Sequence, residues 1–212
     1  MKYKISGNVI RRLPRYLRHL DVLADAGIEK VSSGELGAQM GLTPSQIRQD
    51  LNCFGGFGQQ GYGYNVLQLR EGIQDALGVP ERVGAILIGA GNLGNALLTN
   101  FRFSQCGVRL MAAFDTDPAK IGTKVNGTYI FSVDAVEEFA EDNNVDIAIL
   151  TLPQAAADET ARRVVAAGIR GIWNFTGKDL CLDENEAVVE NVHLSDSLLA
   201  LRYYLRSEER DL

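Results

Sequence analysis

Residues 83–94 read VGAILIGAGNLG, a short apolar run that leads straight into the glycine pattern GxGxxG. A continuous apolar run of this length is typical of a strand buried in a parallel sheet. Helical sequence follows over 95–103, and a second strand over 108–114 ends in Asp115, 21 residues after Gly94. Strand, glycine turn, helix and an acidic residue after the next strand together predict a dinucleotide site.

Each part of this pattern has a physical task. Gly89 permits the tight turn, Gly91 lets the backbone approach a pyrophosphate, and Gly94 lets the helix pack closely on the strand. The pyrophosphate then meets the free N–H groups and the positive end of the helix. Asp115 accepts hydrogen bonds from the adenosine ribose, and an unneutralised carboxylate there repels a 2′-phosphate. We therefore expect NAD(H) rather than NADP(H); a structural glycine turn without a ligand is the alternative.

The chain beyond this motif keeps alternating between strands and helices. Strand-like runs cover 129–131, 146–151, 171–175 and 188–192, and helical stretches cover 133–143 and 155–167. This alternation predicts an α/β fold of the Rossmann type, a doubly wound parallel sheet, with ligands outside the carboxyl ends of its strands. The predicted cofactor-binding residues are Gly89, Ala90, Gly91, Asn92, Leu93, Gly94, Asp115, Thr151, Leu152, Pro153, Asn174 and Phe175.

Several kinds of chemistry lack their residues in this sequence. A dehydrogenase needs a general acid or base near the nicotinamide, and the only histidines are His19 and His193, both outside the predicted sheet. The three cysteines are scattered, so we expect reduced thiols and neither a zinc site nor a disulfide framework. No apolar run approaches the roughly 20 residues that cross a bilayer, and no secretory signal is visible. We therefore expect a cytoplasmic binding protein with no membrane segment and no metal.

The first 80 residues predict a separate helical unit. An amphipathic helix covers 9–26 and contains Pro14, so it either begins near that residue or kinks there. Capping-box patterns at 32–35 and 43–46 open two short helices, which end near residues 40 and 52. Two short helices joined by a glycine-containing turn are the helix-turn-helix pattern.

The second short helix carries the side chains that suit DNA. Ile47 and Leu51 are four residues apart and must face the core. The outward side holds short amide and hydroxyl groups with Arg48 beside them, which suits base edges in a major groove. Alternating aromatic residues and glycines over 54–64 predict two short strands around a tight turn, a wing. A small helical domain that binds protein is the alternative.

The distribution of charge favours the N-terminal unit as the place for DNA. The whole chain carries a net charge of −6. Residues 1–80 hold nine basic and seven acidic side chains, a net of +2, and the remainder holds 12 minus 20, or −8. Phosphates would dock where the balance is positive, although +2 is a weak signal.

A last helix is expected over 196–206, with Ser195 as its N-cap. Apolar residues surround most of its circumference, so this helix needs burial on more than one side. One small Rossmann unit offers a single face. Insertion between domains or into a second subunit would supply the rest, which indicates a homodimer and suits a palindromic operator.

The sequence resembles the Rex family, the NADH-responsive redox-sensing transcriptional repressors. The resemblance covers nearly the whole chain, and its motifs are together highly specific. They are IRRLPRYLR (10–18), SSGEL (32–36), IRQDLNCFG (47–55), GYGY (61–64), GAGNLG (89–94), FDTDP (114–118), TLP (151–153) and WNF (173–175).

The resemblance implies a winged-helix DNA-binding domain at 1–80, a Rossmann NAD(H)-binding domain at 81–192 and a C-terminal helix at 193–212 that is swapped within a homodimer. It also implies that NAD+ permits binding to an operator in double-stranded DNA and that NADH releases it, so that genes of fermentative metabolism are repressed. The expected DNA-binding residues are Arg11, Arg12, Ser33, Pro44, Ser45, Gln46, Arg48, Gln49, Phe57, Gly58, Gln59, Gln60 and Tyr62.

Two departures from the family pattern concern DNA affinity. The family usually has Lys directly after the Arg of the recognition helix, where this chain has Gln49. The wing tip, often basic in the family, is Gln59-Gln60. Loss of these positive charges should lower the affinity for DNA and its dependence on salt.

Two further departures concern the redox switch, which in the family is an Arg that exchanges between an Asp and a Tyr across the dimer. Arg18 matches the Arg, whereas Asn100 stands at the Tyr position and His193 at the Asp position. Dinucleotide binding should persist, but its coupling to DNA should weaken. Asp196, one helical turn beyond His193, is a possible substitute carboxylate.

Three other functions stay open on the sequence. The first is an NAD-dependent oxidoreductase with an accessory helical domain, which the missing acid and base disfavour. The second is a Rossmann-type regulator of another nucleotide, since function does not follow from fold. The third is a Rex-like paralogue with a weak or altered response to NADH.

Overall fold

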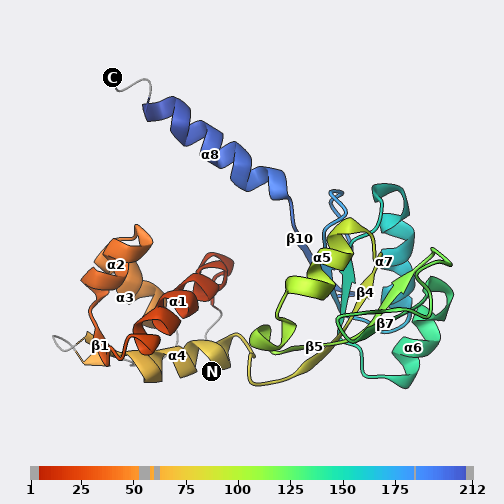
Figure 1. Cartoon of the computed structure of the whole chain (residues 1–212). Helices are drawn as coiled ribbons and strands as arrows, with labels where there is room; N and C mark the ends of the chain where they lie inside the picture. Colours follow the sequence, from red (N-terminus) through yellow and green to blue (C-terminus); the bar gives the residue numbers. More distant parts are fainter. Residues whose placement is uncertain (1–4, 53–57, 60–62, 184, 209–212) are drawn as a thin grey trace. The chain divides into compact units, whose positions relative to one another are not determined.

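The computed structural model describes residues 5–52, 58–59, 63–183 and 185–208. The chain divides into two compact units, Met1–Glu81 and Arg82–Leu212 (Figure 1). Every helix and strand described below belongs to one of these two units.

The N-terminal unit has the element order of a winged helix-turn-helix. Its elements are α1 (Gly7–Asp25), β1 (Lys30–Val31), α2 (Ser33–Met40), α3 (Pro44–Asn52), β2 (Gly58–Gln59), β3 (Gly63–Asn65) and α4 (Val66–Ala76). The strands form an antiparallel sheet in the order β1-β3-β2. The helices and the hairpin agree with the sequence prediction, which did not include β1 or α4.

The long first helix begins earlier than expected. Ser6 is its N-cap and accepts a hydrogen bond from the N–H of Val9, and the helix then continues through Pro14. Pro14 therefore does not mark its start. On the buried side of α1, Tyr16 is fully buried, whereas its neighbour Leu17 is only partly so.

Caps set the ends of the two short helices. Ser32 and Glu35 exchange side-chain and backbone hydrogen bonds of 3.1 and 2.7 Å, which confirms the first capping box. Gly41 ends α2 in the left-handed region at φ 64°, where glycine carries no steric cost. At α3, Thr43 accepts a 3.2 Å bond from the N–H of Gln46, one half of the second predicted box.

The second unit is built on a seven-stranded sheet in the order β10-β9-β8-β4-β5-β7-β6. All neighbours are parallel except the edge pair β6–β7. The strands are β4 (Val83–Ile88), β5 (Val108–Asp115), β6 (Lys124–Val125), β7 (Thr128–Ser132), β8 (Ile147–Leu150), β9 (Gly171–Asn174) and β10 (Val188–Asn191). The chain builds outward from β4 in one direction and then resumes at β8 on its other side. This doubly wound order confirms the Rossmann prediction and puts the topological switch point at β4 and β8.

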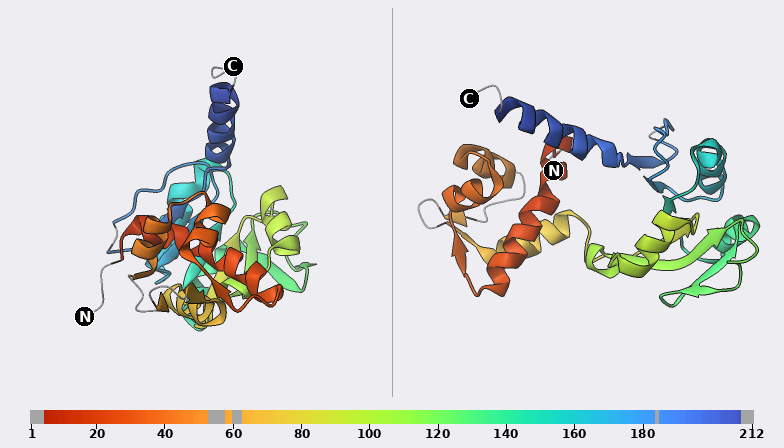
Figure 2. Two further views of the ribbon diagram at one scale, coloured as in Figure 1. Left: turned by 90° about the vertical axis from the view of Figure 1, so that its left-hand side faces the viewer. Right: turned by 45° about the horizontal axis from the view of Figure 1, so that its top comes forward.

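Helices lie on both faces of this sheet (Figure 2). Successive side chains of β4 alternate between two cores: Ile86 and Ile88 belong to one and Ala85 and Leu87 to the other. The first core is closed by α6 (Val136–Asp142) and α7 (Ala157–Ala166), and the second by α5 (Asn92–Asn100) and the 3₁₀ helix η1 (Phe103–Cys106). The short 3₁₀ helices η2 (Val133–Ala135) and η3 (Gln154–Ala156) lead into α6 and α7.

The prediction of a helix over 95–103 was wrong at both ends. Gly91 is the N-cap of α5, so the helix begins inside the glycine motif at Asn92. It ends at Asn100 because Phe101 adopts an extended conformation, with φ −82° and ψ 130°. The early start matters for the site, since it brings the N–H groups of the first turn to the end of β4.

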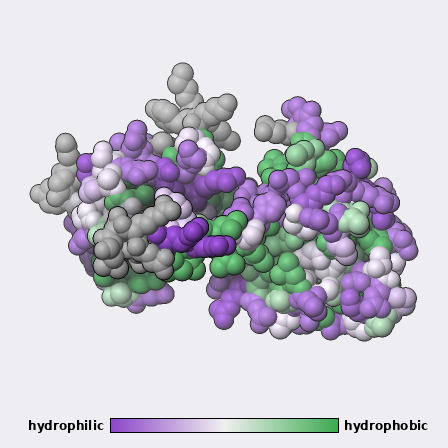
Figure 3. Space-filling view, turned by 90° about the horizontal axis from the view of Figure 1, so that it is seen from above, coloured by the Kyte–Doolittle hydropathy of each residue, from purple (hydrophilic) through white to green (hydrophobic). Residues whose placement is uncertain are grey.

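The C-terminal helix α8 (Leu194–Glu208) also begins before its predicted start. Ser195 lies within the helix and is not its cap. Hydrophobic groups remain on the surface of the molecule seen in Figure 3. The described side chains of α8 are exposed along its whole length, which leaves its large hydrophobic residues in solvent. They are Leu194, Leu198, Leu199, Leu201, Tyr203, Tyr204 and Leu205.

Candidate functional site

The glycine turn after β4 shows the close approaches that the motif requires. Gly89 has φ +100°, and a Cβ there would lie 2.8 Å from the carbonyl oxygen of Thr151. A Cβ on Gly94 would collide with the carbonyl oxygen of Gly89, so the helix and strand approach too closely for any side chain. Gly91 has open space beside it, with nothing within 4 Å. The open space beside Gly91 would let a pyrophosphate come close to the protein backbone.

The N-terminus of α5 faces this space with main-chain donors. Gly91 offers no side chain to cap the helix, and the first hydrogen bond of the helix ladder runs from Asn95 N–H to Gly91 C=O. The N–H groups of the first turn have no acceptor within the helix, and they lie at its positive end. Such an end is a ready anion site, which fits a pyrophosphate.

A cleft of about 280 Å³ adjoins the glycine turn. It is bordered by the turn, by α5 and by the segment between β5 and β7. Its lining residues are Ala90, Gly91, Asn92, Asn95, Lys120, Thr123, Val125 and Ile130. Polar and aliphatic side chains thus share the cleft, as a nucleoside requires.

Asp115 ends β5 beside this cleft and is 8% exposed. Its Oδ1 accepts a 2.9 Å bond from Asp117 N–H, and Lys120 Nζ lies 3.2 Å from its Oδ2. Burial raises the pKa of Asp115, but these two donors outweigh it and hold the pKa below its ordinary value. Asp115 is therefore ionised and paired. The sequence-based assumption of an unneutralised carboxylate was wrong, because Lys120 is only five residues on and turns back to it.

Side chains in the turns after β8 and β9 stabilise the site by hydrogen bonds within the protein. Thr151 Oγ1 donates a 2.7 Å bond to the carbonyl oxygen of Gly89, so this hydroxyl fixes the glycine turn. Asn174 is 1% exposed, donates to Lys178 C=O and Asn191 Oδ1, and accepts from Thr176. Both side chains shape the carboxyl edge of the sheet. The other predicted residues of these turns are more accessible than Asn174: Leu152 and Phe175 are partly exposed and Pro153 is exposed.

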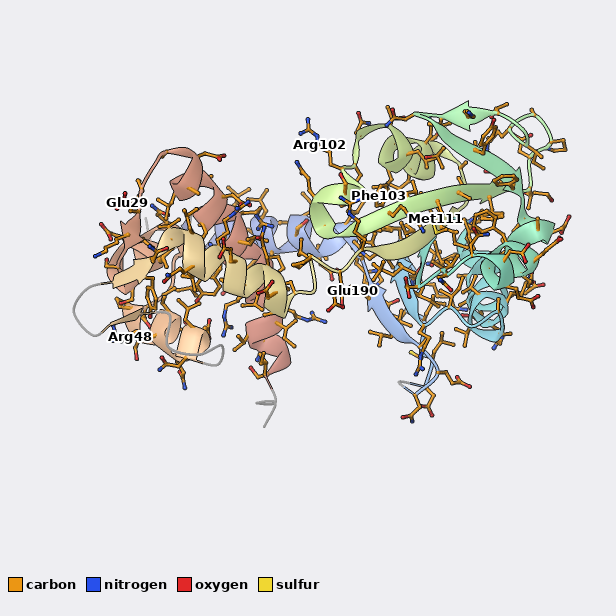
Figure 4. The ribbon with its side chains drawn as sticks, turned by 90° about the horizontal axis from the view of Figure 1, so that it is seen from below. Glu29, Arg48, Arg102, Phe103, Met111 and Glu190 are labelled. Atoms are coloured by element: carbon orange, nitrogen blue, oxygen red, sulfur yellow. The ribbon has the colours of Figure 1, made fainter. Side chains whose placement is uncertain are left out.

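Arg48 and Ser33 come together on the helix-turn-helix unit. Arg48 Nη1 donates a 3.0 Å bond to Ser33 Oγ, linking α3 to the first turn of α2, and the Arg48 side chain is exposed (Figure 4). Pro44, Ser45 and Gln49 are exposed on the same helix, while Ile47 and Leu51 are buried as predicted. The structure thus gives α3 one polar, solvent-facing side that carries Arg48.

Arg12, which was predicted to contact DNA, is paired within the N-terminal unit. Its guanidinium makes two 2.7 Å bonds to the carboxylate of Asp50 in α3. Neither Asp50 nor its partner Tyr16 was singled out in the sequence. The available signal was an acidic residue one turn from Ile47 on the core side of α3, where a carboxylate requires a partner. Arg11, by contrast, is exposed on α1.

The wing is present as β2 and β3, paired with Gly58 opposite Tyr64 and Gln59 opposite Gly63. The predicted contacts Phe57, Gln60 and Tyr62 lie outside the described residues. This hairpin follows α3 directly in the sequence, as a wing should.

The three residues at the switch positions are divided between the units. Arg18 is exposed on α1, and Asn100 ends α5 with its side-chain amide donating a 3.1 Å bond to Ala96 C=O. His193 precedes α8, and its Nε2 lies 2.7 Å from Asp179 Oδ1. The bond to Asp179 raises the pKa of His193. A carboxylate, that of Asp179, therefore lies beside His193 and is bonded to it.

The described part of the chain holds neither a cluster of metal-ligating side chains nor a helix that could cross a membrane. No group of three or more His, Cys, Asp or Glu residues there is placed to hold a metal ion. Among the helices of the same residues, none is long and apolar enough to span a bilayer.

Comparison with protein families matches both units. Residues 4–52 match a family described as "Putative DNA-binding protein N-terminus", and residues 80–177 match the "CoA binding domain" family. The redox-sensing transcriptional repressor Rex of Caldanaerobacter subterraneus is 49% identical over 97% of this chain and 91% of its own length. Rex of Clostridium botulinum is 48% identical over 98% of this chain and 99% of its own.

Solved structures agree. RSP in complex with β-NAD+ and operator DNA has a TM-score of 0.90 and 47% identity, covering 98% of this chain and 95% of RSP. RSP in complex with β-NADH has a TM-score of 0.90 and 44% identity, covering 98% and 97%. RSP is a Rex-family repressor.

Fold, site and relatives together define a transcriptional repressor that uses a Rossmann sheet for ligand binding and not for catalysis. The expectation of a protein that is not an enzyme is thereby confirmed. The chain belongs to the Rex family of redox-sensing transcriptional repressors.

Proposed function

We propose that this chain is a homodimeric repressor that binds a palindromic operator in the cytoplasm and responds to the ratio of NADH to NAD+. One observation carries the proposal. A glycine turn open at Gly91, with Asp115 beside its cleft, is joined in one chain to a helix-turn-helix whose exposed side carries Arg48. The proposal also agrees with RSP, which was solved with β-NAD+ and operator DNA and with β-NADH.

The dinucleotide half of the proposal assigns each part of the ligand to residues that fit it. The pyrophosphate would lie over Gly91 at the N-terminus of α5, where main-chain donors and the helix dipole favour an anion. The adenosine would enter the cleft, with its ribose hydroxyls at Asp115. The nicotinamide half would extend toward the turns at Leu152 and Phe175, which follow β8 and β9 at the switch point.

The DNA half of the proposal assigns α3 to the major groove and the β2–β3 hairpin to the wing. Arg48 would read a base edge, with Ser45, Gln46 and Gln49 beside it, and Ser33 would hold Arg48 in place. Arg11, Pro44 and the hairpin would position the unit along the phosphates.

The homodimer is supported by two apolar surfaces that one copy leaves uncovered. All described side chains of α8 are exposed, including Leu198, Tyr203 and Leu205. At the β10 edge of the sheet, Val188 is 71% exposed, and beside it on β9 Trp173 is partly exposed while its ring packs against Phe101 and Phe175. Exposed apolar surfaces of this extent mark interfaces. We propose that α8 of each copy covers apolar surface of the other.

The test is a fluorescence anisotropy titration against the tightest duplex selected from a random-sequence library, with and without saturating NADH. We expect a palindromic site, binding by two copies and weaker binding with NADH. The variant that tests the nucleotide site is Gly91→Ala, whose methyl group meets no protein atom within 4 Å but fills the space assigned to the pyrophosphate. It should fold, bind the duplex and lose its response to NADH.

Two results would contradict the proposal. One is failure to select any duplex from the library with a protein that is folded by circular dichroism. The other is an unaltered response of Gly91→Ala to NADH, which would put the dinucleotide elsewhere.

A further inference from the structure

A carboxylate is buried on the inner side of the helix assigned to DNA. Asp50 in α3 is 3% exposed and lies between Ile47 and Leu51, the two apolar residues that anchor α3 to the core. An ionised carboxylate at such a position is costly unless it is paired and hydrogen-bonded. The burial of Ile47 and Leu51 follows from their apolar side chains, whereas the burial of Asp50 requires a separate structural or functional reason.

Both oxygens of this carboxylate are held by α1. Arg12 donates from Nε to Oδ2 and from Nη2 to Oδ1, each at 2.7 Å, and Tyr16 OH donates to Oδ2 at 2.9 Å. Arg12 and Tyr16 are four residues apart, so they share one side of α1. Burial, then the bond to Asp50, raise the pKa of Tyr16, which keeps its hydroxyl protonated as a donor.

This arrangement controls more than whether α3 packs against α1. Contacts of Ile47 and Leu51 are apolar and tolerate small rotations or shifts of the helix. A two-point fork between a guanidinium and a carboxylate is directional, so it fixes both the rotation and the position of the turn that carries it. The side chains that follow Ile47 on the outer side of that turn are Arg48 and Gln49, both exposed.

We propose that Asp50 is a positioning residue for DNA reading, and that Arg12 and Tyr16 act through it to aim Arg48 at the bases. This inference rests on the proposed function of α3. It gives Arg12, which was predicted to contact DNA, a role within the protein; the alternative role is a direct contact with a phosphate. The two roles predict opposite signs for Asp50, because removal of a negative charge near phosphates should tighten binding, whereas loss of the fork should weaken it.

The experiment measures affinity for the selected operator and for an unrelated duplex over a range of salt, using full-length protein. Asp50→Asn should weaken operator binding by at least about tenfold, the cost of losing charge-assisted bonds, and leave binding to the unrelated duplex unchanged or tighter. The matched control Asp25→Asn removes the same charge from the exposed end of α1 and should not weaken operator binding.

Two Arg12 variants separate positioning from phosphate contact. Arg12→Lys keeps the charge but loses the fork, so positioning predicts a loss similar to that of Asp50→Asn. Arg12→Met should lower operator affinity without changing the slope of affinity against salt. A phosphate contact would instead be largely retained by Lys, and its loss in Met would reduce the slope by about one.

Folding is controlled by circular dichroism and by NADH affinity, which resides in the other unit and should be equal in all variants. Tyr16→Phe keeps the buried ring and removes one bond, so it should cost only about threefold to fivefold. Tight operator binding by folded Asp50→Asn, or by Arg12→Lys, overturns the inference. Failure of the parent protein to bind any duplex would instead reject the proposed function.

Discussion

At the scale of single residues, the ribose end of the nucleotide cleft combines an acid and a base. Asp115 is expected to repel a 2′-phosphate, but Lys120 lies 3.2 Å from it and 3.7 Å from Asp117. An ammonium in that place offsets part of the repulsion and offers a phosphate a partner. We therefore expect the Asp115–Lys120 pair, and not Asp115 alone, to set any preference for NADH over NADPH.

Replacement of Lys120 should sharpen this preference. In Lys120→Met we expect NADPH to lose about threefold to tenfold in affinity relative to NADH, since Asp115 is then unneutralised and the pair is only partly buried. Asp115→Ala should weaken NADH and narrow the gap. Isothermal titration with both nucleotides measures the ratio, and Lys124→Met is the control because Lys124 lies over the Tyr129 ring. An unchanged ratio in Lys120→Met would reject this account, as would equal affinity of the parent for the two nucleotides.

His193 should titrate as a residue paired to a carboxylate. The pKa of His193 is raised, chiefly by the bond to Asp179. The stabilisation that the charged pair gives the folded protein is therefore complete below the pKa of an unfolded histidine, and it is lost as pH rises through the raised pKa. A pH titration followed by NMR should show a His193 pKa above 6.5, and Asp179→Asn should lower it. The signal of His193 is assigned by its absence in His193→Gln. If Asp179→Asn left the titration unchanged, the bond would be absent in solution.

At the scale of elements, α3 shows how one short helix separates two tasks. Its inner side is anchored by Ile47, Asp50 and Leu51, and its outer side is polar and exposed. Gln49 stands on that outer side where the family usually has Lys. Arg48 is the one basic residue of α3, so under the proposed function it supplies the positive charge of this helix for DNA.

A single added charge should reveal the geometry of this helix on DNA. Gln49→Lys should tighten operator binding and steepen its slope against salt by about one, the signature of one more phosphate or guanine contact. Gln105→Lys adds the same charge to η1 in the other unit and should change neither. Arg48→Ala should abolish specific binding and leave NADH affinity intact. A salt slope that is the same in Gln49→Lys and the parent would mean that Gln49 does not face the duplex.

Most elements with a strong local signal were predicted; α4 was missed despite its Asn65 cap and its apolar residues at helical spacing, and β1, which depends on a distant partner, was missed as well. Apolar runs gave all the parallel strands, and the pattern at 32–35 gave the start of α2. β1 is two residues long and exists only through its pairing with β3, so its sequence carries no periodic signal. The roles of Asp50 and Lys120 likewise arise from residues brought together by folding. Fold and glycine turn were thus predicted, and the side-chain network around them was not.

At the scale of the whole molecule, function requires that the nucleotide unit and the DNA unit affect each other. A ligand moves such an equilibrium only by its differential affinity for the two states. The resemblance predicts a switch in which Arg18 needs an anionic partner, with Asn100 and His193 at the partner positions; in the structure Asn100 bonds to Ala96 and His193 to Asp179. A neutral or cationic partner binds arginine less well than a carboxylate does.

The coupling between NADH and DNA should accordingly be incomplete. We expect saturating NADH to release only part of the bound operator, with a coupling below the roughly 1–3 kcal/mol usual for allosteric systems. His193→Asp combined with Asn100→Tyr should strengthen release. Operator binding is titrated with NADH for the parent, both single variants and the double variant. Asp196→Ala tests the substitute carboxylate at the start of α8.

Sharp and complete release by the parent protein would reject the weak switch. If Asp196→Ala or Asp179→Asn then abolished that release, the carboxylate responsible would be identified. Equal NADH affinity in every variant is the control that separates coupling from binding.

The bare apolar surface of α8 has a consequence for gene dosage. Under the proposed assembly, a copy that meets no second copy keeps a hydrophobic helix in water, so dilution favours dissociation and partial unfolding by mass action. Active repressor then rises with roughly the square of the chain concentration while monomers predominate. The rate at which the cell synthesises this chain then affects repression in addition to the redox state. A modest fall in its expression relieves repression more than proportionally.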